Sequence, residues 1–186
     1  MTRGIETMSG DPTMEPENSG SREKRGELAE GACHPTSSGM MQLPSFATTA
    51  LLAFARRIMT TEPAQILGPE GDPYLRRWWL EKDAVTGSVY VHDMLRSDQD
   101  AEMHDHPGDN LSIVLDGEMI EYRPDGAVRH GPGTMVSRRA EDRHRIEIRD
   151  RLVTIFVMGE RVREWGFWEG DRFVPSQQFF SERGYF

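Results

Sequence analysis

The pattern of hydrophobic and polar residues divides the chain into three parts. Residues 1–43 are rich in Gly, Ser, Glu, Pro and Thr and contain no aromatic residue. Such a segment cannot bury enough apolar surface to offset the entropy of ordering it, so we expect a disordered tail. Residues 44–73 are predicted to hold one short helix and a linker, and residues 74–186 to form the main domain.

The helix is predicted over residues 45–59. Ser45 belongs to the residue types that cap helices. The apolar residues that follow recur on one side of a helix, at Phe46, Leu51, Leu52, Phe54 and Ile58. Pro63 and the pair Gly68-Pro69 would then end it.

From Tyr74 onward, short segments with strand character are separated by turn residues. The predicted strands cover residues 76–81, 88–94, 111–122, 134–138, 144–148 and 152–158. Turn residues stand at Asp116-Gly117, Pro124-Asp125-Gly126 and Pro132-Gly133. Many short strands with such turns predict an all-β sandwich or barrel.

Charge and composition narrow the classes of partner. The formal net charge is -9, and basic residues are interleaved with acidic ones, which disfavours a nucleic acid partner. The longest apolar stretch, residues 47–55, is too short to span a membrane, so we expect no membrane partner. Cys33 is the only cysteine, so no intrachain disulfide can form, and we expect a cytoplasmic protein.

Histidines supply the candidate chemistry. Five of the six lie between residues 92 and 144, and two of them form His104-Asp105-His106. On a strand, side chains at positions i and i+2 project from the same face, so both imidazoles could bind one metal ion. Taken alone, however, a His-x-His pair on a protein surface arises equally well by chance.

The residues around this pair resemble the two motifs of the cupin superfamily, Gly-x5-His-x-His-x3/4-Glu-x6-Gly and Gly-x5-Pro-x-Gly-x2-His-x3-Asn. In this sequence His104 and His106 lead to Gly117 with the first spacing, and Gly133 leads to His144 with the second. The resemblance covers roughly residues 74–174. It implies a double-stranded β-helix, or jelly-roll barrel, that binds one divalent metal ion through His104, His106 and His144.

The sequence also departs from these motifs. Asp98 replaces the opening glycine and Asn110 the glutamate, while Arg139, Glu141 and Ile148 replace the later Pro, Gly and Asn. Asn110 can offer only a neutral oxygen, to a substrate or to a metal-bound water. Asp109 is one residue out of register, and it could serve as a ligand only if a β-bulge turned it inward.

Three neutral imidazoles leave the charge of the ion intact and leave coordination positions open, which is typical of catalytic sites. Within the cupins this variant looks like the thiol dioxygenases and β-diketone dioxygenases. The resemblance implies an iron(II) oxygenase acting on a small molecule, with Zn, Ni or Mn as other candidate ions. A non-redox lyase, isomerase or epimerase and a non-catalytic small-molecule binder remain open as alternatives.

Further residues are candidates for the site. His92 and Tyr90 share a strand face and, with Asn110, form the predicted catalytic set, although either ring could equally be a core residue. Substrate binding is predicted for three more side chains, Arg76, Arg161 and Trp78, with surface ion pairs or core packing as the alternative. His130 is expected in an exposed loop. The segment 160–168 is expected to be a strand that leaves the barrel and packs on a partner subunit in a homodimer.

Overall fold

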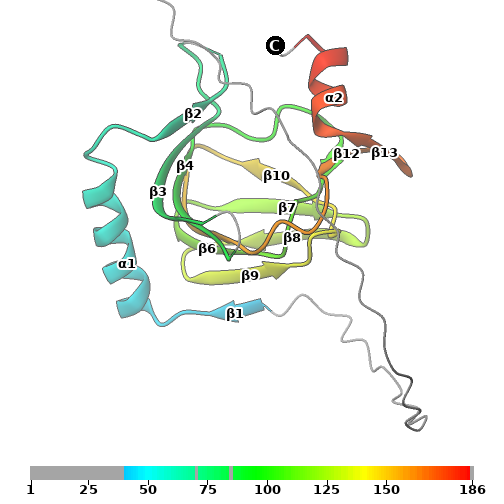
Figure 1. Cartoon of the computed structure of the whole chain (residues 1–186). Helices are drawn as coiled ribbons and strands as arrows, with labels where there is room; N and C mark the ends of the chain where they lie inside the picture. Colours follow the sequence, from blue (N-terminus) through cyan, green and yellow to red (C-terminus); the bar gives the residue numbers. More distant parts are fainter. Residues whose placement is uncertain (1–39, 70, 84–85, 185–186) are drawn as a thin grey trace, which may run out of the picture. The chain divides into compact units, whose positions relative to one another are not determined.

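The computed structural model describes residues 40–69, 71–83 and 86–184 (Figure 1). Most of the tail expected over residues 1–43, including Cys33, lies outside these residues. Within the described part, β1 (Met40–Gln42) pairs antiparallel with β9. The ordered chain therefore includes residues that we expected to belong to the tail.

The predicted helix is present as α1 (Ser45–Ile58). Its N-cap residue is Pro44 rather than Ser45, and the Pro44 carbonyl accepts hydrogen bonds from the backbone N–H groups of Ala47 and Thr48. Ala55 is fully buried against the large sheet, but Phe46, expected on the apolar side, is 77% exposed. The helix thus packs through the buried Thr48 and Ala55 and the partly buried Leu51, Leu52 and Ile58, while the Phe46 side chain stays outside.

The remaining elements are twelve strands and one short C-terminal helix. The strands are β2 (Gln65–Leu67), β3 (Leu75–Asp83), β4 (Gly87–Met94), β5 (Met103–His104), β6 (Asn110–Asp116), β7 (Met119–Arg123), β8 (Gly126–His130), β9 (Thr134–Arg138), β10 (Arg145–Ile148), β11 (Leu152–Met158), β12 (Gly166–Glu169) and β13 (Arg172–Pro175); the helix is α2 (Ser176–Glu182). A seven-stranded sheet has the order β1-β9-β6-β11-β4-β3-β2. Two three-stranded sheets have the orders β10-β7-β8 and β13-β12-β5.

The strand order from β4 to β11 is that of a jelly roll. Strands β4, β6, β9 and β11 lie in the large sheet, whereas β7, β8 and β10 form the facing sheet. Strand β5 adjoins the start of β10 through backbone hydrogen bonds between His104 and His144. The chain therefore crosses repeatedly between two antiparallel layers, which confirms the predicted all-β jelly roll. The hydrogen-bonded sheets are not closed into a single ring.

Two of the motif glycines are required by backbone geometry. Gly117 has φ 81°, and a Cβ atom there would lie 2.0 Å from the carbonyl oxygen of Arg151. Gly133 has φ 89°, and a Cβ atom there would lie 2.5 Å from Nε2 of Gln42. Both positions combine a left-handed conformation with a close approach, so only glycine fits without strain.

Alternate residues of the large sheet face two different cores. Between the two layers lies a cluster formed by Leu75, Met94, Val114, Met119, Val136, Ile146, Ile148 and Leu152. The outer face, which carries Trp78, Val91, Leu115, Val153 and Ile155, is covered by α1. A third cluster packs Phe167 and Val174 against Phe179 of α2. Residues of opposite parity on one strand therefore belong to different environments.

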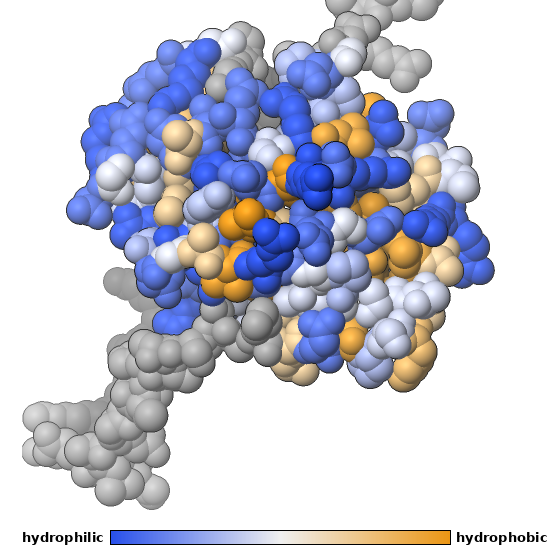
Figure 2. Space-filling model, turned by 180° about the vertical axis from the view of Figure 1, so that it is seen from behind, coloured by the Kyte–Doolittle hydropathy of each residue, from blue (hydrophilic) through white to orange (hydrophobic). Residues whose placement is uncertain are grey.

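The surface seen in Figure 2 is dominated by hydrophilic residues, with hydrophobic ones interspersed among them. This mixture agrees with the interleaved acidic and basic residues of the sequence. Among the described residues, no helix has the length and apolar character needed to cross a lipid bilayer.

Candidate metal centre

Three histidines converge between the layers. His104 ends β5, His106 follows two residues later, and His144 directly precedes β10. One ring nitrogen from each lies within 4.8 Å of the others. The Nε2 atoms of His106 and His144 are 3.3 Å apart. The structure therefore brings together the three residues that the motif resemblance selected.

Backbone hydrogen bonds fix this convergence. The N–H of His104 donates to the carbonyl of His144 at 2.8 Å, and the N–H of His144 donates back to the carbonyl of His104 at 2.9 Å. The N–H of His106 donates to the carbonyl of Ala140 at 3.0 Å. Backbone hydrogen bonds therefore hold the segment with His104 and His106 beside the segment with His144, about forty residues later in the sequence, without help from a ligand.

The protonation of the cluster suits a cation. Burial lowers the pKa of His106 well below its ordinary value, and the neighbouring His104 and Arg138 lower it further. Burial also lowers the pKa of His144, with Arg138 as the next cause. Both rings are therefore neutral near pH 7 and offer lone pairs. The cluster of donors contains imidazoles alone, which fits a transition metal such as iron, zinc or nickel.

Asp98 lies beside the third ring. Its Oδ2 atom is 3.7 Å from Nδ1 of His104 and accepts a hydrogen bond from the backbone N–H of Ile146 at 2.6 Å. Its Oδ1 atom accepts a hydrogen bond from the Tyr74 hydroxyl at 2.5 Å. Asp98, which replaces the first motif glycine, is thus held in place next to Nδ1 of His104. Carboxylates in this position commonly orient histidines that bind metals.

Asp105 anchors the His-x-His segment from the opposite face of its strand. Its side chain is completely buried and accepts three hydrogen bonds. The donors are Nη1 of Arg163 at 2.5 Å, Nε1 of Trp168 at 2.9 Å and the backbone N–H of Gly166 at 2.9 Å. The residue between the two candidate ligands therefore ties them to the C-terminal segment.

Asn110 lies at the start of β6, in a polar network rather than in the cluster of ligands. Its Oδ1 atom is 3.4 Å from Nη1 of Arg138, which also donates to Oγ of Ser112 at 2.9 Å. Arg138 in turn pairs with the fully buried Glu121. Asp109 is not turned towards the histidines, because its Oδ1 atom accepts the backbone N–H of Ala140 at 2.9 Å.

His92 and Tyr90 face the interior but are separated from the cluster by Phe156. The His92 ring stacks on Phe156 with centroids 5.1 Å apart, and Phe156 lies 5.6 Å from the His106 ring. Nε2 of His92 accepts a hydrogen bond from Nε of Arg77 at 2.9 Å, so the proton of the ring is on Nδ1. Burial, followed by Arg77, lowers the pKa of His92, which is therefore neutral.

The three predicted substrate-binding residues do not reach the histidines. Arg76 and Trp78 belong to the outer face of the large sheet, where Trp78 packs in the cluster under α1. Arg161 is exposed in the loop after β11. Two other arginines face the interior. Arg77 is the residue next to Arg76 in β3, and Arg138 is the last residue of β9.

His130 corrects an expectation. It is not an exposed loop residue but the last residue of β8, and only 1% of it is exposed. Its Nε2 atom lies 2.9 Å from Oε2 of Glu121, so the ring supplies a partner that this buried carboxylate requires. The turn pair Pro132-Gly133 suggested a loop, but β8 continues through His130 before the turn.

The segment 160–168 does not form one strand that leaves the domain. Only its end belongs to a strand, β12, which pairs with β5 and β13. The N–H groups of Val162 and Arg163 reach the carbonyl of Pro107, at 2.8 Å and 3.2 Å. These residues hold the candidate metal segment in place, and packing on a partner subunit remains a prediction.

Sequence reasoning missed the interior residues Arg77, Asp105, Arg138 and Phe156. The position of Arg138 could have been predicted, because it lies on the same face of the predicted strand 134–138 as the apolar Val136, and the structure buries both residues. For Asp105 none existed, since its role depends on Arg163 and Trp168 from a distant segment.

No protein-family model matches the chain, and no curated protein matches its sequence. Several solved structures are similar at low identity. A cupin superfamily protein from Desulfitobacterium hafniense is 17% identical over 51% of this chain and 84% of its own, with a TM-score of 0.42. A cupin-2 domain protein from Shewanella frigidimarina is 11% identical over 57% of this chain and 92% of its own, with a TM-score of 0.43.

A protein from Silicibacter pomeroyi, named a sugar phosphate isomerase from a cupin superfamily, is 15% identical over 53% of this chain and 68% of its own, with a TM-score of 0.43. All three carry the cupin name. Similarity at this level says nothing about the reaction of this chain, and the jelly roll assigned above rests on its own strand order.

Proposed function

We propose that this protein is a metal-dependent enzyme for a small molecule, with one ion bound by His104, His106 and His144. The observation that carries the proposal is the convergence of three ring nitrogens within 4.8 Å, without a carboxylate in the cluster. Two of the rings are neutral because of burial, so they can bind a cation without first losing a proton.

Iron(II) is the ion that we propose. Three imidazoles leave the full charge of a divalent ion and several coordination positions available, as in catalytic rather than structural sites. The resemblance to three-histidine dioxygenases favours iron among the metals that imidazole suits. A bound iron(II) ion would supply a redox centre with positions open to small molecules, so we propose oxygenase chemistry.

The charge of the interior favours an anionic substrate. Arg77 faces the interior, where its Nε atom donates to His92, and its Nη1 atom donates to Oε1 of Gln65 at 3.1 Å. Neither partner carries a negative charge that would balance the guanidinium. Tyr90 packs under its guanidinium at 4.7 Å. Arg77 can therefore attract a negative group, while His92 and Tyr90 provide polar atoms next to the aromatic wall formed by Phe156.

The test begins with protein purified without oxygen. We expect about one iron per chain after reconstitution, measured by elemental analysis. Consumption of O2 on addition of small organic acids then tests the oxygenase step. His144→Ala should lose both iron and O2 consumption, whereas His92→Gln should keep its iron, because His92 lies outside the cluster of ligands.

The outcomes separate the candidate functions. Iron retained by His144→Ala at the wild-type level would contradict the metal site itself. Full turnover under argon with Zn or Ni would contradict the oxygenase step and favour a lyase, isomerase or epimerase on the same three histidines. A chain that binds small acids at the histidines equally well with and without metal, and that does not turn them over, would be a binding protein rather than an enzyme.

A further inference from the structure

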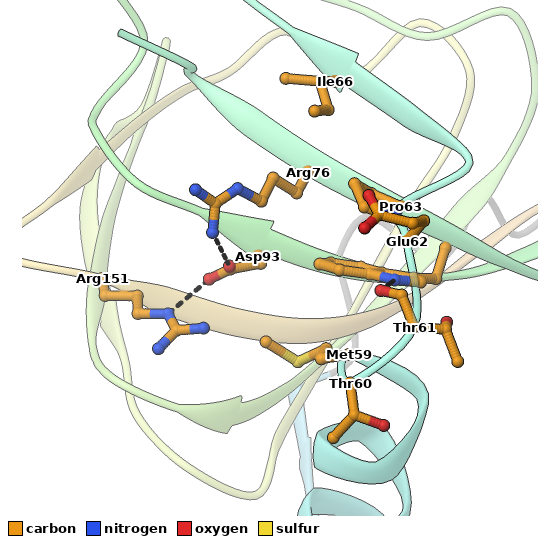
Figure 3. Close-up of a pocket in the computed structure, with 10 residues that line it drawn as sticks. Met59, Thr60, Thr61, Glu62, Pro63, Ile66, Arg76, Asp93 and Arg151 are labelled. Carbon is orange, nitrogen blue, oxygen red and sulfur yellow. Dashed lines mark hydrogen bonds and ion pairs between the residues drawn. The ribbon is translucent and has the colours of Figure 1, made fainter. Parts of the chain in front are cut away.

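A cavity of about 440 Å³ lies on the outer face of the large sheet, next to the C-terminal end of α1 (Figure 3). Its charged residues are Arg76 of β3, Asp93 of β4, Arg151, which precedes β11, and the exposed Glu62. Trp78 and Met59 supply apolar surface. Since Arg76 and Trp78 have the opposite parity to the interior residue Arg77, this cavity is separate from the histidine cluster. Its volume falls in the range of small-molecule sites.

A buried carboxylate stands between two arginines in this cavity. Asp93 is 1% exposed, and its Oδ1 atom accepts a hydrogen bond from Nε of Arg151 at 2.5 Å. Nη1 of Arg76 is 3.8 Å from Oδ2 of Asp93, which is too long for a hydrogen bond. Among the described residues, Oδ2 has no hydrogen-bond partner. Figure 3 shows both guanidinium groups directed at Asp93, Arg76 from β3 and Arg151 from the turn before β11.

Internal ion pairing alone does not account for this arrangement. Arg76 and Asp93 are direct cross-strand neighbours, so one arginine would be enough to balance the carboxylate. Arg151 adds a second positive charge, and its side chain is 54% exposed. The two guanidinium groups therefore keep N–H donors directed at solvent, next to a buried acceptor that has no donor.

The rest of the cavity carries both polar and apolar residues, with Thr60, Thr61 and Glu62 beside Met59, Pro63, Ile66 and Trp78. The Trp78 side chain is fixed by a hydrogen bond from its Nε1 to the Thr61 carbonyl at 3.0 Å. Ile66 at the rim is 56% exposed, a large fraction for a hydrophobic residue. An apolar body placed here would bury part of this surface beside the charged end.

We propose that this cavity binds a small organic acid with an apolar body and a hydrogen-bond donor beside its carboxylate. The carboxylate would pair with the free N–H groups of Arg76 and Arg151. The Asp93 Oδ2 atom is covered in this structure, so the hydroxyl or amino group would donate to it once the half-exposed Arg76 side chain turns towards the ligand carboxylate. The apolar body would lie on Trp78 and Met59. This site does not depend on the proposed metal chemistry.

Three probes of one size test the chemistry: phenyllactate, phenylpropanoate and phenylpropanol. Each is titrated into the full-length protein, and the NMR signal of the Trp78 indole N–H, assigned with Trp78→Phe, is followed. We expect the tightest saturable binding for phenyllactate, weaker binding for phenylpropanoate, which lacks the hydroxyl, and the weakest for phenylpropanol, which lacks the carboxylate.

Three variants locate the site. Arg151→Gln should weaken phenyllactate binding at least about tenfold, the usual cost of a lost charged hydrogen bond in a binding site. Arg149→Gln, an exposed arginine two residues away, and His104→Ala in the histidine cluster should bind as the wild type does. Arg76→Gln provides a second test of the charged end if Arg151→Gln does not fold.

Four results would overturn the proposal. The Trp78 signal could fail to respond to phenyllactate, or respond equally to all three probes. Arg149→Gln could weaken binding as much as Arg151→Gln does. Loss of binding in His104→Ala would place the acid at the histidines instead.

Discussion

At the scale of single residues, buried carboxylates set the position of the candidate ligands. Asp105 stands between His104 and His106 in the sequence, yet it points away from them into a pocket of donors from residues 163–168. Three hydrogen bonds offset the cost of burying the Asp105 carboxylate, so this contact fixes the segment over residues 104–106. The imidazole rings of His104 and His106, which point the other way, are therefore held in place as well.

Replacing Asp105 by Asn should therefore weaken metal binding. The amide keeps the size of the side chain but loses the ion pair with Arg163. We expect the dissociation constant for the metal to rise about 10- to 100-fold, as for other residues that orient ligands. Competition with a chromophoric chelator measures this constant, and denaturation of the metal-free protein measures stability separately.

Asp93→Asn is the matched control for this experiment. Asp93 is also a buried carboxylate paired with an arginine, but it lies on the outer face of the sheet. It should lower the free energy of unfolding without changing metal affinity. If both variants weakened metal binding to the same extent, Asp105 would contribute only general stability.

The residue scale also shows where sequence reasoning reached its limit. His104 and His106 could be paired from their i, i+2 spacing alone, and His144 from motif spacing. Arg76, in contrast, was chosen where the structure places Arg77 in the interior. A shift of one residue along a strand exchanges its inner and outer faces. The local sequence does not indicate which of Arg76 and Arg77 faces the interior.

At the scale of elements, a buried charge network joins β7, β8 and β9. Glu121 of β7 is completely buried and contacts Arg123, His130 of β8 and Arg138 of β9. Burial raises the pKa of Glu121, but His130 and the two arginines outweigh this effect and lower it to about 2. The facing sheet is therefore linked by charge to the strand that carries Arg138.

This network predicts a specific sensitivity to acid. Because the pKa of Glu121 is lower in the folded state than its ordinary 4.5, its stabilising contribution is complete above about pH 5 and is lost as the pH falls towards 2. Over this window the wild type should lose about 3 kcal/mol more unfolding free energy than Glu121→Gln. Urea denaturation at several pH values measures this difference, and parallel pH profiles would contradict it.

Helix α1 is held by the outer face of the large sheet. Leu115 of β6 is 1% exposed and belongs to the cluster that α1 covers. Leu115→Ala should cost about 2–5 kcal/mol of unfolding free energy, through lost transfer energy and a new cavity. Phe46→Ala, in the exposed first turn, should change it by less than about 0.5 kcal/mol. Denaturant titrations compare the two variants, and equal losses would show that the first turn also carries the packing.

The elements that sequence analysis predicted are those with strong internal patterns. Helix α1 has a clear apolar side, and β4, β6, β9 and β11 alternate or end at turn residues. The short strands β1, β5 and β13 and the helix α2 were not predicted, and β12 was expected only as the end of one longer strand over residues 160–168. Their formation depends on partners far away in the sequence, such as β12 for β5, and not on their own periodicity.

At the scale of the whole molecule, the candidate site exists only because two distant segments meet. His104 and His106 follow the first strand of the jelly roll, and His144 stands just before β10, where the facing layer returns beside β5. The jelly roll could be predicted from strand spacing and the motif resemblance. The separation into unclosed sheets could not, because it depends on the twist and edge pairing of the layers.

The central claim is that three imidazoles from these segments bind one ion. X-ray absorption spectroscopy at the iron edge, on protein reconstituted without oxygen with one equivalent of iron(II), tests it most directly. We predict nitrogen and oxygen ligands with the outer scattering of three histidine rings, and no such histidine signature in His144→Ala, which should lose the iron. A first shell without imidazole scattering, or one unchanged in His144→Ala, would contradict it.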